Sequence, residues 1–329
     1  MEMTWDQWKA MKKDLRRRFS GTGWTLLIYY IILNVAVFAW VFLETIWMML
    51  QSFPFGEPAD LEQIAMDASQ SGWGYVLAII IGLLILLLWK KPRYFREELF
   101  AKGQPMSTGT FFGILCVFLG GQFLSQMMLS VTELLLNLFG YSILGGLEAL
   151  SVDFGDFSMF LYAGILAPVT EEILFRGLVQ RSLMPFGKRF AIFCSAFTFG
   201  LFHGNLVQTP FAFLVGLVLG YVAAEYNIFW AMLLHMINNL VIADMLTRLL
   251  SFLPEVIAGV VIWLIFLAFA VAALVILISK REQIRRWRSG EFIHKTYLSC
   301  FFTSAGMIVF TLVIGLMMIY SFVIMVSPL

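Results

Sequence analysis

Apolar runs long enough to cross a membrane recur along most of the chain, and they restrict its fold more than any other feature. A membrane-spanning helix needs about 20 mostly apolar residues. Hydrophobic residues make up 60% of the chain and charged residues only 13%, whereas soluble domains carry about 25% charged residues. The sequence therefore predicts an all-α, polytopic transmembrane helix bundle of eight to nine spans. We place the spans at residues 23–50, 73–89, 109–131, 157–184, 190–207, 209–226, 228–250, 254–279 and 297–326.

The loops between these runs differ sharply in charge. Of the 22 Lys and Arg residues, all but Arg248 fall before the first span or in and around the loops near 90–102, 176–189 and 280–295. The alternate loops near 57–67 and 148–156 are acidic instead. We predict a multi-pass protein of the cell (plasma) membrane, with the basic loops in the cytoplasm because Lys and Arg are retained on that side. Its amino terminus is then cytoplasmic and Leu329 lies outside.

Adjacent glutamates and an arginine lie inside the predicted span 157–184. An unpaired charge at bilayer depth costs at least ~2.5–3.5 kcal/mol, so such residues face the bundle interior and find partners. Glu172 and Arg176 are four residues apart and share a helix face, which predicts an ion pair. Glu171 is rotated by about 100° from Glu172. The spacing predicts one structural carboxylate, held by Arg176, and one carboxylate that is free for chemistry.

Two histidines lie in the apolar runs that follow. Phe199 and His203 share one helix face, and so do His235 and Asn239. At the rise of an α-helix these side chains and Glu171 reach similar depths in the middle to inner half of the bilayer. Buried ionic and polar groups also hold transmembrane helices together. Their concentration on three helices favours a functional site over packing alone.

Three motifs in this order resemble those of the CPBP family, the CaaX-protease and bacteriocin-processing (Abi) group that includes the Ras-converting CaaX endopeptidase. They are Glu171-Glu172 with Arg176, Phe199 with His203, and His235 with Asn239. The resemblance implies a glutamate-type intramembrane endopeptidase. In that family scheme Glu171 and His203 activate a water, His235 and Asn239 stabilise the oxyanion, and the supporting residues are Glu172, Arg176 and Phe199.

Peptide hydrolysis needs a base for water and donors for the oxyanion, and these residue types supply both. Zinc bound by Glu171, His203 and His235 is the rival mechanism. The resemblance favours metal-free chemistry with no cofactor. A second function class also stays open, a non-catalytic membrane scaffold or regulator, or a bacteriocin-immunity protein. A transporter is a third reading, and it predicts an internal pseudo-symmetry that the sequence does not display.

The expected partners follow from this reading. They are membrane lipid and a peptide or protein substrate presented from the cytoplasm or inner leaflet, and no nucleic-acid signature is present. Gly216 and Gly220 form a GxxxG pattern, which is used in helix packing and leaves a homodimer possible. We divide the chain into a basic cytoplasmic segment (1–22), amino-terminal transmembrane helices (23–156), a CPBP-like catalytic core (157–250) and carboxy-terminal transmembrane helices (251–329). The basic segment is a topogenic flank or, alternatively, an amphipathic helix on the inner leaflet.

Overall fold

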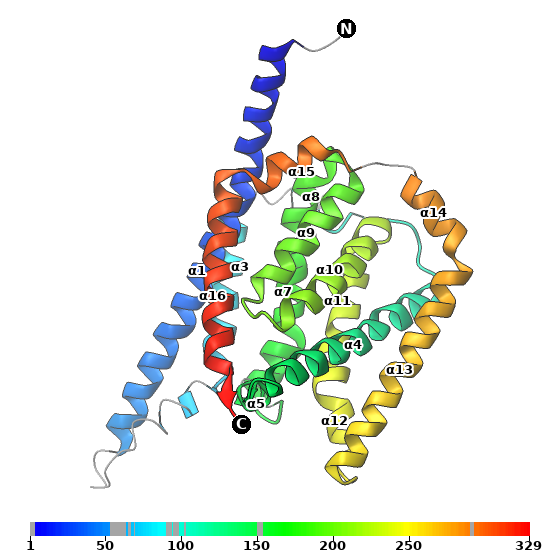
Figure 1. Ribbon diagram of the computed structural model, residues 1–329. Coiled ribbons are helices and arrows are strands. Elements are labelled where there is room, and N and C mark those ends of the chain that lie inside the picture. Colours follow the sequence, from blue (N-terminus) through cyan, green and yellow to red (C-terminus); the bar gives the residue numbers. More distant parts are fainter. Residues whose placement is uncertain are drawn as a thin grey trace.

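The computed structural model describes residues 4–52, 64, 67–68, 70–89, 94, 99–101, 103–149, 154–289 and 293–329. Almost all of them are helical (Figure 1), which confirms the predicted all-α bundle. Seven helices of the described part are long and apolar enough to cross a membrane. They cover Trp5–Gln51, Thr108–Asn137, Phe157–Phe186, Gln208–Glu225, Ile228–Leu249, Glu255–Ser279 and Ala305–Met325.

The elements before the site are α1 (Trp5–Ser52), α3 (Trp73–Trp89), α4 (Thr108–Asn137), strand β1 (Tyr141–Ser142) and α5 (Leu144–Ala149). The next span is made of α6 (Phe157–Met159), η3 (Phe160–Leu166), α7 (Ala167–Glu172), η4 (Ile173–Gln180), α8 (Arg181–Leu183) and η5 (Met184–Phe186). After it come α9 (Lys188–Phe202), α10 (Gln208–Glu225), α11 (Ile228–Ile237), η6 (Asn238–Met245) and α12 (Leu246–Leu249). The chain ends with α13 (Glu255–Ser279), α14 (Arg281–Ser289), α15 (Lys295–Phe302), α16 (Ala305–Met325) and strand β2 (Ser327–Pro328).

Two of the predicted spans form shorter helices than expected. The prediction at 73–89 corresponds to α3, with 17 residues, and that at 190–207 to α9, with 15 residues. At about 1.5 Å per residue, α9 is about 22 Å long, less than the ~30 Å hydrocarbon core of a bilayer. The α9 helix lies among other helices of the bundle (Figure 1). Its polar residues therefore sit at the end of a short helix inside the protein.

The predicted start of the last span at residue 297 is wrong. Residues 295–302 form the separate helix α15, and α16 begins only at Ala305. The break allows α16 to pack on α1, where Gly306 meets the backbone of the earlier helix so closely that a Cβ would lie 2.1 Å from the Ser20 carbonyl oxygen. The Gly306 amide donates to Ser20 Oγ at 2.8 Å. This close approach requires glycine.

The basic amino-terminal segment is continuous with the first span. Helix α1 runs unbroken for 48 residues, about 72 Å at the usual rise of an α-helix, and its amino-terminal end extends beyond the bundle (Figure 1). Phe19 is buried among the rings of Phe186, Phe190 and Phe301. The segment is thus the extended amino-terminal end of a membrane-length helix, and its roles as a topogenic flank or as an amphipathic helix on the inner leaflet both stay predictions.

The basic segments gather at one end of the bundle. Lys188 pairs with Glu225 at 2.8 Å, Arg189 donates to the Arg288 carbonyl at 2.6 Å, and Arg16 donates to Thr303 at 3.2 Å. The carboxy terminus lies at the other end (Figure 1), where β2 pairs with β1. Most of the acidic loop near 57–67, part of that near 148–156 and most of the basic loop near 90–102 lie outside the described residues. The basic segments share one end, and its assignment to the cytoplasm stays a prediction.

A matched pair of serines tests this orientation. Ser289 is the last residue of α14 at the basic end, and Ser251 follows α12 at the other end. Both are exposed, and each hydroxyl donates to the carbonyl three residues earlier. We expect Ser289→Cys to react with an impermeant maleimide in inverted vesicles and Ser251→Cys to react in intact cells. The unmodified chain, whose Cys194 and Cys300 are buried, gives the background. The opposite sidedness would overturn the orientation.

Candidate active site

The candidate site residues come from three neighbouring segments: the α7–η4 junction, the end of α9, and the α11–η6 junction. Both junctions are places where an α-helix passes into a π-helical turn, and η3 and η4 flank α7 on both sides. π-Helical turns are rare and are frequent at functional sites, because they widen the helix and re-aim its side chains. The bundle therefore departs from regular α-geometry in the segments that carry the polar residues.

The predicted ion pair between Glu172 and Arg176 is confirmed. Arg176 Nη1 lies 3.1 Å from Glu172 Oε1, and neither side chain is exposed at all. Arg176 also lies over the Phe199 ring at 4.3 Å from its centroid. A charge this deeply buried is tolerated only with such partners.

The two glycines of the GxxxG pattern contact the span that carries the Glu172–Arg176 ion pair. Arg176 Nη2 donates to the Gly216 carbonyl at 3.2 Å, and Gln180 Nε2 donates to the Gly220 carbonyl at 2.9 Å. A Cβ at Gly220 would lie 2.8 Å from Gln180 Oε1, so the glycine lets α10 approach closely. The glycine pair is thus occupied by packing inside the chain. It offers no support for the homodimer, and Gln180 is a buried partner that the sequence analysis did not identify.

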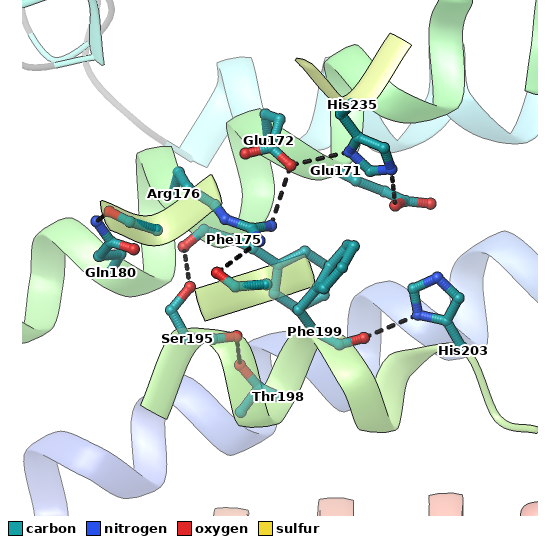
Figure 2. Close-up of polar contacts among 12 residues, drawn as sticks. Glu171, Glu172, Phe175, Arg176, Gln180, Ser195, Thr198, Phe199, His203 and His235 are labelled. Atoms are coloured by element: carbon teal, nitrogen blue, oxygen red, sulfur yellow. Dashed lines mark hydrogen bonds and ion pairs between the residues drawn. The ribbon is translucent and has the colours of Figure 1, made fainter. Parts of the chain in front are cut away.

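His235 joins the ion pair, which the sequence analysis did not predict. Its Nδ1 lies 2.9 Å from Glu172 Oε1 and its Nε2 lies 3.8 Å from Glu171 Oε2 (Figure 2). Since a carboxylate only accepts, Nδ1 donates to Glu172, and this bond fixes the ring. The other nitrogen then faces Glu171. Glu172 is therefore shared by two cationic or donor partners.

Glu171 faces a different direction from Glu172, as its rotation along the helix predicts. Its side chain is 28% exposed and lines a cavity of about 320 Å³. His203 lines the same cavity. Figure 2 shows the Glu171 carboxylate turned away from Glu172 toward the side on which His203 lies. The structure thus brings these two predicted residues to one cavity.

His203 is held by the helix that carries it. Its Nδ1 lies 2.9 Å from the Phe199 carbonyl oxygen. A carbonyl only accepts, so Nδ1 carries the proton and Nε2 of the neutral ring keeps its lone pair. The Phe199 ring packs edge-on against the rings of both His203 and His235, at 4.9 and 5.6 Å between centroids. Phe199 therefore contacts Arg176, His203 and His235 at once.

Asn239 is tied to the widened span opposite it. Its Nδ2 donates to the Ala163 carbonyl at 2.8 Å. In this π-helical turn an amide donates to the carbonyl five residues earlier, as Ala167 does to Tyr162. The Ala163 carbonyl would therefore receive its hydrogen bond from the amide of residue 168. That residue is Pro168, which has no N–H. Asn239 supplies the missing donor.

A chain of amides fixes the orientation of Asn239. Gln122 Nε2 of α4 donates to Asn238 Oδ1 at 2.6 Å, and Asn238 Nδ2 donates to Asn239 Oδ1 at 3.2 Å. Asn239 is absent from the lining of the Glu171 cavity. Among the described polar contacts none joins it to Glu171, His203 or His235, so the structure does not bring Asn239 together with them.

The cavity contains side chains that the sequence analysis missed. Four tyrosines line it, from α1, α3 and η3, namely Tyr29, Tyr30, Tyr75 and Tyr162. No clear sequence signal marked them, because Tyr75 and Tyr162 lie within six residues of the start of their predicted spans, where tyrosine is common anyway. For metal, the described residues contain no group of three or more His, Cys, Asp or Glu side chains placed to hold an ion.

A bundle of membrane-length helices with buried, paired charges defines this protein as a multi-pass membrane protein with an intramembrane polar site. Residues 153–241 match the model of the Rce1-like family, described as type II CAAX prenyl endopeptidase Rce1-like. This match supports the resemblance to the CPBP family that the three motifs predicted, and the matched family is one of CAAX-type intramembrane proteases. No curated protein and no solved structure matches the chain.

The two glutamates are expected to differ in their effect on stability. Glu172→Ala strands the buried Arg176 and leaves His235 without its acceptor, and breaking a buried ion pair costs about 3–5 kcal/mol. Glu171→Ala removes a part-exposed side chain and should lower the thermal midpoint much less. Thermal unfolding of both variants in detergent measures the difference. A larger loss for Glu171→Ala would reverse the assigned roles.

Proposed function

We propose that this protein is a glutamate-dependent intramembrane endopeptidase. The observation that carries the proposal is the placement of Glu171 and His203 on one cavity, while the neighbouring Glu172 is taken up by Arg176 and His235. The proposal extends the family match, which concerns the class of enzyme, to particular residues.

Glu171 is the base in this proposal, and a water between Glu171 and His203 is the nucleophile. The carboxylate takes a proton from the water as the oxygen attacks the scissile carbonyl carbon. His203 Nε2, left as an acceptor by the bond from Nδ1 to Phe199, orients that water. The proton then passes to the leaving amine. A general base of this kind contributes roughly 10²–10⁴-fold to the rate.

His235 and Asn239 are the proposed donors for the oxyanion. His235 Nε2 lies on the Glu171 side of the ring, and when protonated it donates to charge that develops there. The Asn239 amide has two hydrogens, of which one is used by Ala163. The second is the one available to the reaction. Glu172, Arg176 and Phe199 hold the two histidines in place.

The proposed reaction needs no metal. It uses only a carboxylate, two imidazoles and an amide, and these supply a base and donors without a Lewis acid. The proposed substrate is a peptide or protein segment presented from the cytoplasm or the inner leaflet of the plasma membrane, because the basic end of the bundle is predicted to face the cytoplasm.

Removal of the proposed base or its partner should abolish cleavage. We expect Glu171→Gln and His203→Ala to lose at least 10²-fold in turnover, the usual loss for a general base, while both variants stay folded in detergent. Comparative proteomics of cells that express the unmodified chain or Glu171→Gln identifies the substrate and its cleavage site. Cleavage by Glu171→Gln at nearly the unmodified rate would contradict the proposal. If the protein is instead a non-catalytic scaffold, its role in the cell should not change with this substitution.

Asn239 can be tested separately from its packing role. We expect Asn239→Ala to lower kcat by ~10²–10³-fold with KM nearly unchanged, because a transition-state donor contributes little to substrate binding. It should also lower stability, since the Ala163 carbonyl loses its donor. Adding Pro168→Ala returns a backbone N–H to that carbonyl.

The double variant Asn239→Ala/Pro168→Ala should therefore recover thermal stability without recovering turnover. The single variant Pro168→Ala is the control, and it should remain active. Recovery of turnover together with stability in the double variant would show that Asn239 acts only by packing.

A further inference from the structure

Part of the cavity wall comes from helices outside the family-matched segment. Helix α1 contributes Tyr29 and Tyr30, and α3 contributes Tyr75. The matched residues 153–241 include neither helix. The matched segment thus contributes the carboxylate, the imidazole and Tyr162, and α1 and α3 contribute the other three phenols.

Tyr29 differs from the other three tyrosines of the cavity. It is only 4% exposed, and its hydroxyl has no hydrogen-bond partner within the described part of the chain. By contrast, Tyr75 and Tyr162 stack on each other at 4.6 Å, and Tyr30 is only half-buried. An unsatisfied buried hydroxyl is destabilising, and such groups are rare enough to need an explanation.

The structure also leaves room for this hydroxyl. Gly82 of α3 lies directly against it, and a Cβ at this position would be 2.6 Å from Tyr29 Oη and 2.8 Å from the ring carbons beside it. Any larger residue at position 82 would displace the phenol. The position of the hydroxyl is thus fixed by packing between α1 and α3, not by a hydrogen bond.

The Tyr29 side chain shares its cavity with a charged group. Tyr29 and Tyr162 line the same cavity as the Glu171 carboxylate. A phenol titrates near pH 10 in water, so it is a neutral donor at neutral pH. Tyrosine hydroxyls are among the side chains that serve as preorganised donors to an oxyanion.

We propose that Tyr29 is a further catalytic residue, whose hydroxyl donates a hydrogen bond to the carbonyl oxygen of the scissile peptide as negative charge develops on it. This inference rests on the proposed function. It assigns to the cavity a donor from α1. The donors His235 and Asn239 do not line this cavity and are bonded to Glu172 and to Ala163 in the structure. The hydroxyl is buried in the structure, so a bound substrate would have to reach it from the cavity that Tyr29 lines.

The test is a conservative substitution with two readouts. Tyr29→Phe removes one oxygen atom, and we expect kcat to fall by ~10²-fold with KM within about threefold of the unmodified value, as for one oxyanion donor. The thermal midpoint should be equal or higher, because an unpartnered buried hydroxyl has been removed. The probe is a quenched-fluorescent peptide with the cleavage site found by the Glu171→Gln comparison.

Two further variants sharpen the result. Gly82→Ala should lower kcat in the unmodified chain by displacing the phenol, and it should add little loss of kcat in the Tyr29→Phe background. Tyr221→Phe is the matched control, because Tyr221 lies on α10 against Trp287 and outside the cavity. It should leave kcat unchanged.

Each other outcome overturns the inference. A kcat near the unmodified value in Tyr29→Phe, with Glu171→Gln inactive, would remove Tyr29 from the mechanism and leave the proposed function standing. Slower turnover with a lower thermal midpoint would show that the hydroxyl has a structural role. Full activity in both Tyr29→Phe and Glu171→Gln would overturn the proposed function itself.

Discussion

The buried charge of Arg176 is the constraint on which the rest of the site depends. A guanidinium without exposure in a membrane protein needs a counter-ion and hydrogen-bond acceptors within reach. Glu172 supplies the first and the Gly216 carbonyl the second, and the Phe199 ring covers the group. Each of these partners also positions another part of the site. Glu172 orients His235, Phe199 packs on both histidines, and Gly216 brings α10 against the span.

This use of Glu172 explains how two adjacent carboxylates can have different tasks. One is neutralised by a cation and held rigidly, while its neighbour points into a cavity together with His203. The histidine between them contacts Glu172 with one ring nitrogen and faces Glu171 with the other. A supported imidazole between two carboxylates is well suited to preorganised electrostatics, because the bond to Glu172 fixes its orientation.

The sequence predicted the interactions that depend on local spacing. The Glu172–Arg176 pair, the shared face of Phe199 and His203, and the divergence of Glu171 from Glu172 all follow from helix geometry. The contacts between helices could not be read in this way. The bond from His235 to Glu172, the chain from Gln122 to Asn239, and the tyrosines of α1 and α3 join residues 63 and more positions apart, or come from helices without a motif.

Local departures from regular helix geometry explain the remaining differences between the sequence prediction and the structure. The end of α9 and the break before α16 arise where helices pack on one another, and a hydropathy pattern does not contain that information. The π-helical turns around Pro168 change which carbonyl lacks a donor, and so they decide where Asn239 points. Regular α-helical spacing places Asn239 beside His235 but does not predict its partner.

The central claim is that Glu171 activates a water for peptide hydrolysis without a metal. A single-turnover cleavage in ¹⁸O-labelled water by purified, chelator-treated protein tests it most directly. The account predicts full cleavage after chelation, with ¹⁸O in the new carboxyl group from the first turnover. Activity that is lost on chelation and restored by zinc would contradict it. An unlabelled first product would contradict it as well, since Glu171 would then be a covalent nucleophile.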